Sequence, residues 1–84
     1  MKYTVVWIRS ALNELAVIWN SAQDRKEVTK APNTIDAVLK THPYSNSESR
    51  EDNLRIMFVP PLAALFEVSD DDCLVTVRAV WRPS

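Results

Sequence analysis

The sequence has little of three features that mark specialised proteins: cysteine, long apolar runs and an excess of charge of one sign. Its one cysteine, Cys73, cannot form an intramolecular disulfide, and no histidine or second cysteine stands near it at the spacing of a metal site. We therefore expect a buried thiol in a cytosolic protein. We expect no metal and no other cofactor.

The apolar segments near the N-terminus are short. Lys2 is followed by only about five apolar residues before Arg9, which is too few for the core of a signal peptide. No run in the chain approaches the roughly 20 apolar residues that a membrane-spanning helix needs. The sequence therefore predicts a soluble, cytoplasmic protein.

The charges of the chain nearly cancel. Ten lysines and arginines stand against 11 aspartates and glutamates, so the net charge is -1. Nucleic acid is bound largely through phosphate contacts from lysine and arginine, which leaves most nucleic-acid-binding domains clearly basic. Tight binding to bare nucleic acid is therefore disfavoured, although the cations can still be concentrated in a local basic patch on one face.

What the sequence does contain is typical of a small globular domain. Hydrophobic residues make up 46% of the chain and charged residues 25%, which is an ordinary soluble composition. The length of 84 residues predicts a single domain over residues 1–84, with a small and tightly packed core.

The N-terminal part of the chain predicts a strand and a helix. Residues 3–8 are almost all β-branched or aromatic, as in a strand that is buried on both faces. Ser10 is the expected N-cap of the first helix, which ends near Ser21. The apolar residues of this helix recur at intervals of three and four and form one stripe. They are Leu12, Leu15, Ile18, Trp19 and Ala22.

A second helix follows, so that the two helices form a hairpin. Its apolar residues keep the same spacing, and they are Val28, Ala31, Ile35, Val38 and Leu39. Pro32 lies inside this pattern and predicts a kink or a break, because proline lacks the backbone N–H and crowds the preceding turn. The helix is expected to end at residues 41–43, and the polar run at residues 45–52 predicts a surface loop.

From residue 54 onward the apolar residues alternate with a period of two, which predicts three strands at residues 54–59, 63–68 and 75–82. Pro60 and Pro61 cannot donate to a sheet ladder and are expected in the first turn. Residues 69–72 carry serine and aspartate side chains that suit a hairpin turn. The predicted order of elements is therefore β-α-α-β-β-β.

Three successive strands with short connections pair antiparallel, and both helices must cover one face of the sheet to bury their stripes. The predicted fold is α+β, with the helical hairpin packed on one face of a mainly antiparallel four-stranded sheet. The other face stays open, and its mixture of apolar and charged residues suits a partner. Its expected members are Arg55, Met57, Val59, Ala63, Leu65, Glu67, Thr76, Arg78, Val80 and Arg82.

These residues resemble a known family. The order of elements, the start YTVVW, the end of the second helix in LKTHP, and the stretch VPPLAALFEV followed by an acidic turn and LVTVRAVWR are similar to the RelE/ParE toxin superfamily. The resemblance covers nearly the whole chain, and it rests on this pattern without a sharp catalytic signature.

The resemblance implies the toxin component of a bacterial type II toxin-antitoxin system, of the kind found in plasmid stabilisation, wrapped by a cognate antitoxin. In the RelE branch the toxin cleaves mRNA at the ribosome with Lys, Arg and often Tyr side chains and without a metal. In the ParE branch it acts on DNA gyrase. The implied partners are the antitoxin and either the ribosome with mRNA or gyrase, in a homodimer or a toxin-antitoxin hetero-oligomer.

The sequence departs from the superfamily pattern at informative positions. Leu62 and Ala63 stand where the superfamily commonly has Tyr-Arg, and Phe66 stands where relatives often have Tyr. The C-terminal His or Tyr of some ribonucleases of the group is also absent. The catalytic residues are therefore unknown, and whether the chain is an enzyme stays open. The alternative is a non-enzymatic interaction module, a toxin relative that has lost catalytic activity.

Two groups of candidate site residues remain. The candidates for binding phosphate or the target are Arg50, Arg55, Arg78 and Arg82. The candidates for contacting the antitoxin on the open face are Met57, Val59, Leu65 and Val80.

Each candidate also has a structural interpretation. The arginines can form the solvated side of an amphipathic sheet, where charges also prevent edge pairing. His42 is expected to cap the last carbonyls of the second helix, with a catalytic role as the weaker alternative. The three tryptophans, Trp7, Trp19 and Trp81, are expected in the core, and Asp70, Asp71 and Asp72 are expected to form a solvated turn.

Overall fold

The computed structural model describes residues 2–45 and 47–83, and the described residues form two helices and five strands. In chain order these elements are β1 (Thr4–Trp7), α1 (Arg9–Ser21), α2 (Arg25–Thr41), β2 (Ser47–Glu51), β3 (Leu54–Val59), β4 (Leu62–Ser69) and β5 (Leu74–Trp81).

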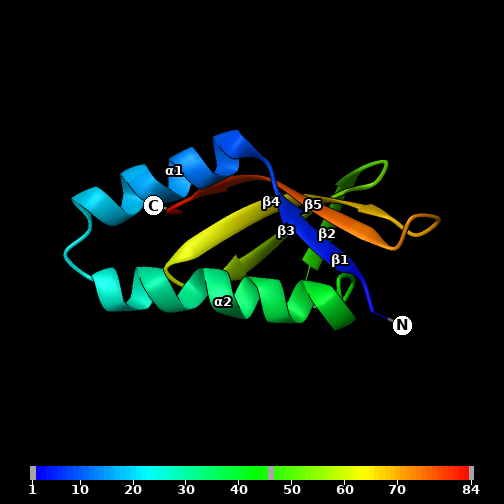
Figure 1. The fold of residues 1–84 in the computed structure, drawn as a ribbon, viewed down its shortest axis with the longest axis horizontal. Helices are drawn as coiled ribbons and strands as arrows, with labels where there is room; N and C mark the ends of the chain where they lie inside the picture. The colour runs from blue at the N-terminus through cyan, green and yellow to red at the C-terminus, as the bar shows by residue number, and fades with distance from the viewer. Residues whose placement is uncertain (1, 46, 84) are drawn as a thin grey trace.

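The strands make one sheet in the order β1-β5-β4-β3-β2. Strand β1 runs parallel to β5, and the other three pairs are antiparallel. Both helices contribute buried residues to the same core on one side of this sheet, and β5 runs beside α1 (Figure 1). The predicted α+β fold, a helical hairpin on one face of a mainly antiparallel sheet, is confirmed.

The sheet has one strand more than predicted, because β2 forms inside the stretch at residues 45–52 that we expected to be a loop. Its sequence SESRE is polar, and four of its five residues are exposed. β2 pairs only with β3, at the edge of the sheet. An edge strand that buries neither face needs no alternation of apolar residues, so the sequence pattern cannot reveal it.

The predicted stripe of helix α1 is only partly buried. Ala11 is fully buried and Leu15 and Ile18 pack against the core, whereas Leu12 is 50% exposed and Trp19 42%. The helix also starts two residues earlier than expected, at Arg9. Ile8 is its N-cap and makes no side-chain capping bond, so the expectation that Ser10 caps the helix is wrong.

Helix α2 runs without interruption through Pro32, so the predicted break does not occur. Its apolar residues recur at intervals of three and four, so they form one stripe that is buried in the core. The buried residues of this stripe are Val28, Ala31, Ile35 and Leu39. The helix ends at Thr41, as predicted.

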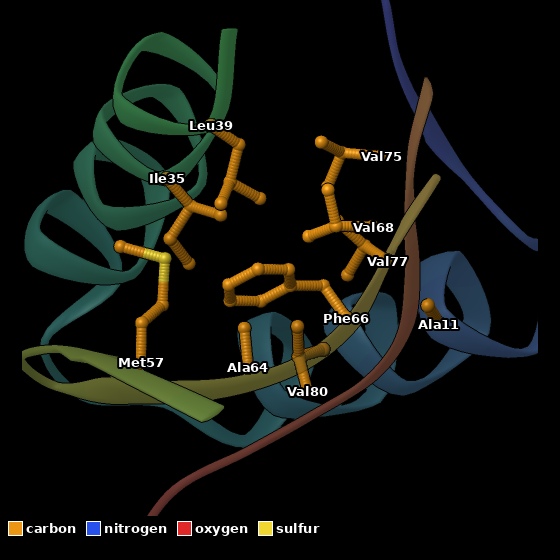
Figure 2. Close-up of a cluster of buried hydrophobic side chains, with 10 residues drawn as sticks. All are labelled: Ala11, Ile35, Leu39, Met57, Ala64, Phe66, Val68, Val75, Val77 and Val80. Atoms are coloured by element: carbon orange, nitrogen blue, oxygen red, sulfur yellow. The ribbon is translucent and has the colours of Figure 1, made fainter. Parts of the chain in front are cut away.

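The core is centred on the fully buried ring of Phe66 in β4 (Figure 2). Ile35 and Leu39 of α2 approach this ring from one side, and Met57 of β3 lies beside them. Six further small or branched side chains complete the cluster, and they are Ala11, Ala64, Val68, Val75, Val77 and Val80. Phe66 therefore packs as a core residue.

The two faces of β3 are the reverse of those predicted. Residues that pair directly across neighbouring strands share a face. Met57 pairs with the core residue Ala64, and Arg55 pairs with Phe66. Arg55, Met57 and Val59 therefore start from the face that the helices cover. Five of the six residues of β3 are apolar, so only the charge of Arg55 suggested which side faced solvent.

Strand β5 changes phase at a bulge. Val77 pairs with Phe66, but Ala79 pairs with Leu65, so that Arg78 is the extra residue. As a result Val80 joins the core cluster and is 2% exposed, although strict alternation placed it on the open face. Trp81 moves to the open face, where it pairs with Ala63.

The chain contains no glycine, so other residues take the turn positions with positive φ. These are Asp52, with φ 49°, between β2 and β3, and Cys73, with φ 50°, between β4 and β5. Asp is among the residues that tolerate this left-handed region. Cys73 is half-buried in this turn, and its expected place in the core is therefore wrong.

Candidate functional site

The four candidate arginines do not gather on one surface. Arg78 lies on the open face. Arg55 contacts Tyr44, which follows the end of α2. Arg82 contacts Asp24, which precedes the start of α2. Helix α2 has 17 residues and is therefore about 25 Å long. The expectation of a joint arginine surface is wrong, because the phase of β3 and the bulge in β5 separate the side chains.

Arg55 is held on the helix-covered face beyond the core. Its Nε donates to Ser47 Oγ at 2.7 Å and its Nη2 to the Ser47 carbonyl oxygen at 2.9 Å. The guanidinium lies over the ring of Tyr44, 5.0 Å from the centroid. The long side chain thus carries its charge out of the apolar interior to a partly buried polar cluster.

Asp70 joins that cluster from the turn between β4 and β5. Its carboxylate accepts a hydrogen bond from the Tyr3 hydroxyl at 2.8 Å and from the Tyr44 hydroxyl at 2.9 Å. The bond to Asp70 raises the pKa of Tyr3 to about 12, and burial together with Asp70 raises the pKa of Tyr44. Both phenols therefore stay protonated at neutral pH and act as hydrogen-bond donors to Asp70.

The turn at residues 69–72 was expected to be only solvated. Asp71 and Asp72 are exposed, in agreement with that expectation, but Asp70 ties the N-terminal strand and the segment after α2 to the β4–β5 turn. Tyr3 and Tyr44 are therefore residues that the sequence reasoning missed, and Asp70 was expected only in a solvated turn. Tyr3 lies 67 positions and Tyr44 lies 26 positions before Asp70 in the sequence, so no local spacing pattern predicts their contacts.

Arg78 and Arg50 are surface cations. Arg78 pairs with Glu67 on the open face through a single contact of 3.4 Å, with both side chains close to half exposed. Such exposed pairs contribute little to stability. Arg50 is exposed at an irregularity in β2, and it forms no ion pair with any of the described residues.

Arg82 makes the strongest ion pair of the described residues. Its Nη1 and Nη2 donate to Oδ1 and Oδ2 of Asp24 at 2.8 and 2.9 Å. The hydrogen bonds from Arg82 lower the pKa of Asp24, and the same contact raises the pKa of Arg82. This bidentate contact joins the end of β5 to the connection between the helices.

The second group of candidates divides between the two faces. Met57 and Val80 are each 2% exposed and Val59 packs against the core, so the expectation that these three lie on the open face is wrong. Leu65 does lie on the open face, beside its strand partners Ile56 and Ala79. A role of these four residues in binding an antitoxin stays a prediction.

The open face is ordered in rows across β3, β4 and β5. Phe58, Ala63 and Trp81 form an apolar row, in which Phe58 is 56% exposed and Ala63 is fully covered. At the other end of the face, Glu67 pairs with Arg78. Ala63 is therefore a small, buried residue between two aromatic side chains.

A groove follows the edge of β5 beside α1. Strand β1 pairs with residues 74–77 only, so the rest of this edge meets no strand among the described residues. The Glu14 carboxylate of α1 accepts the Val80 N–H there at 3.1 Å. A hollow of about 460 Å³ lies beside this contact, and Val17, which is 67% exposed, lines it. Glu14 is a further residue that the sequence pattern did not single out.

The tryptophans have three different environments. Trp7 packs against the core and its Nε1 donates to Asp36 at 3.3 Å. Trp19 is 42% exposed beside a hollow between the helices, with the Arg25 guanidinium 4.7 Å from its ring centroid. Trp81 lies on the open face. The expectation of core packing is therefore confirmed for Trp7 and wrong for Trp19 and Trp81.

His42 caps α2 through its backbone, because its N–H donates to the Val38 carbonyl at 2.7 Å. Its Nδ1 lies 2.8 Å from Thr41 Oγ1 on the surface, so the expected side-chain capping of the last carbonyls is wrong. None of the candidate arginines has a histidine among its hydrogen-bond partners in the described residues. No helix of the described residues is long and apolar enough to cross a membrane.

No family model matches this chain, and no curated protein matches it in sequence. Solved structures do match it. A chain of the toxin-antitoxin complex RelBE2 from Mycobacterium tuberculosis has a TM-score of 0.82 at 13% identity, and the match covers 99% of this chain and 93% of that one.

Two further structures agree. A chain of the chromosomal ParDE system of P. aeruginosa has a TM-score of 0.68 at 17% identity, with 99% of this chain and 98% of that chain covered. A chain of the intact RelBE toxin-antitoxin complex of E. coli has a TM-score of 0.65 at 18% identity, with 98% of both chains covered. The resemblance read from the sequence is confirmed for the fold, which is the fold of these chains from RelBE and ParDE toxin-antitoxin systems.

Proposed function

We propose that this chain is the toxin component of a toxin-antitoxin pair and that a cognate antitoxin protein neutralises it. The observation that carries the proposal is the fold, which matches a chain of the M. tuberculosis RelBE2 toxin-antitoxin complex over 99% of this chain. The match to an archaeal RelE–RelB complex from Pyrococcus horikoshii, with a TM-score of 0.71, supports the same role.

The apolar surface supports a protein partner. Val17 beside the β5 edge and Phe58 on the open face are 67% and 56% exposed. Both lie in apolar surroundings, the groove along α1 and the row with Ala63 and Trp81. Exposed apolar patches of this kind are typical of protein–protein contact sites. The antitoxin is the partner that the proposed role requires.

The charge distribution supports action through a protein surface, as in inhibition of gyrase, more than cleavage of mRNA at the ribosome. Cleavage needs cations that converge on one phosphate and a base beside them. Here Arg55, Arg78 and Arg82 are dispersed, and the last two are already paired with carboxylates. This dispersion also favours a second candidate function, an interaction module that has lost catalytic activity.

Co-expression with the product of the adjacent gene tests the antitoxin role. We expect the two proteins to elute together in size-exclusion chromatography as a complex larger than this chain. Val17→Asp is expected to weaken the complex if the groove beside β5 is the contact, whereas Asp71→Asn on the exposed turn leaves it unchanged. Separate elution of the wild-type chain and the adjacent gene product would count against the role.

Two assays separate the targets. Primer extension on translating ribosomes reports mRNA cleavage, and a supercoiling assay reports inhibition of gyrase. We expect no cleavage that depends on Arg82, and cleavage that Arg82→Ala abolishes would contradict this expectation. A chain that binds its antitoxin but does not arrest growth fits the interaction module.

A further inference from the structure

Arg82 has the most complete anionic partner of the candidate cations. Both terminal nitrogens of its guanidinium donate to the two oxygens of Asp24, at 2.8 and 2.9 Å. By contrast, Arg78 reaches Glu67 through one contact of 3.4 Å, and Arg55 donates to Ser47. A guanidinium holds a phosphate with the same two-pronged geometry with which it holds a carboxylate. The Asp24 carboxylate thus occupies Arg82 as a phosphate group would.

Asp24 is placed unusually for its residue type. It is the N-cap residue of α2, where aspartate is favoured because its side chain accepts a backbone N–H of the first turn. The Asp24 side chain makes no such bond and faces Arg82 instead. The Asp24 carboxylate therefore has two alternative partners, which are the Arg82 guanidinium and the backbone N–H groups in the first turn of α2. If the carboxylate moves away from Arg82, it can accept a backbone N–H of α2 instead.

We propose that Asp24 is a built-in competitor at a phosphate-binding site on Arg82. In this account the carboxylate holds the guanidinium until a backbone phosphate of nucleic acid displaces it, and it then turns to cap α2. The inference rests on the proposed function, because both candidate targets, the ribosome and gyrase on its DNA, include nucleic acid. It explains how a chain with a net charge of -1 reserves one cation for such a target.

The surroundings of the pair allow this exchange. The side chains of Arg82 and Asp24 are 40% and 36% exposed, at the rim of a hollow of about 490 Å³. Arg25, the neighbour of Asp24, is engaged elsewhere, because it donates to the carbonyl oxygens of Trp19 and Asn20. No other carboxylate forms an ion pair with Arg82 among the described residues. Displacing Asp24 alone frees the guanidinium.

The test is a titration of a labelled single-stranded 12-residue oligonucleotide, in RNA and DNA forms, over a series of salt concentrations. Asp24→Asn frees Arg82 and can still cap α2. We expect it to tighten binding about three- to tenfold at low salt, within the range of the net contribution of one hydrogen-bonded contact. The slope of log K against log salt should steepen by about 0.7, the value for one added phosphate contact on a single strand.

Two controls make the result specific. Asp71→Asn removes the same charge from an exposed turn and is expected to leave the slope unchanged. Adding Arg82→Ala to Asp24→Asn should cancel both the gain in affinity and the change in slope. The same outcome is expected with RNA and DNA, because phosphate is the group they share.

Three outcomes would overturn the proposal: equal gains for Asp24→Asn and Asp71→Asn, a gain that survives Arg82→Ala, or no binding by Asp24→Asn at low salt. The titration uses neither an antitoxin nor a growth readout. Its failure therefore leaves the toxin role intact, and absence of an antitoxin complex leaves the titration result intact.

Discussion

Arg55 and Phe66 lie directly opposite each other on β3 and β4, so a charged side chain and the central ring of the core start from the same face of the sheet. The ring is fully buried, whereas the guanidinium reaches past the core to Ser47 and Tyr44. A long side chain can thus begin beside the core and still place its charge in a polar setting. Met57, two residues further along β3, therefore faces the helices.

This orientation of β3 predicts that substitutions at two adjacent residues lower the free energy of unfolding by different amounts. Met57→Ala is expected to lower the free energy of unfolding by about 2–5 kcal/mol, because it leaves a cavity beside Ile35 and Leu39. Phe58→Ala is expected to cost about 1 kcal/mol or less, since its side chain is 56% exposed. Urea denaturation of both variants measures the difference. A larger cost for Phe58→Ala would place Met57 on the open face after all.

The hydroxyls of Tyr3 and Tyr44 predict an unusual alkaline titration. They are the chain's two tyrosines, and both donate to Asp70, which raises the pKa of Tyr3 to about 12 and also raises that of Tyr44. The unfolded value is about 10, so this stabilisation is present below pH of about 10 and is lost as the pH rises toward the folded values. Ultraviolet absorbance of the phenolates should therefore show little ionisation at the pH where unfolded tyrosine is half ionised.

Asp70→Asn supplies the control for that titration. It removes the negative charge and a strong acceptor, so the phenol titration is expected to move down toward the ordinary value of about 10. Asp72→Asn, in the same turn but without a bond to either tyrosine, should leave it in place. Identical titrations for the wild type and Asp70→Asn would rule out the cluster in solution.

The contact between Asp24 and Arg82 predicts part of the acid sensitivity. The pKa of Asp24 is lowered by Arg82, so its stabilising effect is present above the unfolded value of about 3.9 and is lost as the pH falls through the folded value. The melting temperature of the wild type should fall more steeply in this acidic range than that of Asp24→Asn. An equal dependence of the melting temperature on pH in the two proteins would mean that the ion pair contributes nothing to stability in solution.

The Glu14 side chain is expected to protect the backbone amide of Val80 from hydrogen exchange. Its carboxylate accepts the Val80 N–H at 3.1 Å, where the edge of β5 has no neighbouring strand in the part of the chain that the structure describes. Glu14→Ala should therefore speed hydrogen exchange at Val80, whereas Glu14→Gln keeps an acceptor and should change it less. The amide of Val77, in the paired part of β5, is the internal reference. Unchanged exchange at Val80 in Glu14→Ala would remove the side chain from this role.

The sequence predicted the parts of the fold that local patterns encode. Both helices, the later strands and the turn at residues 69–72 follow from apolar spacing and turn-forming side chains. The β2 strand was missed because SESRE has no apolar alternation. The faces of β3 were reversed because nearly all its residues are apolar, and the bulge at Arg78 in β5 has no local signature.

The candidate site was less predictable than the fold, since it depends on contacts between distant residues. The pair of Arg82 with Asp24 spans 58 positions, and Tyr3 with Asp70 spans 67. Each of these side chains has an ordinary solvated alternative, so only the packing of the sheet and helices decides its partner. A binding role of the four arginines stays a prediction, and their separation follows from strand phase.

The central claim, that the chain is a toxin held in check by a partner, is tested most directly by growth after controlled induction. The account predicts that cells expressing the chain alone stop growing and that growth resumes when the adjacent gene product is expressed with it. Undiminished growth of cells that accumulate the folded wild-type chain would contradict the claim.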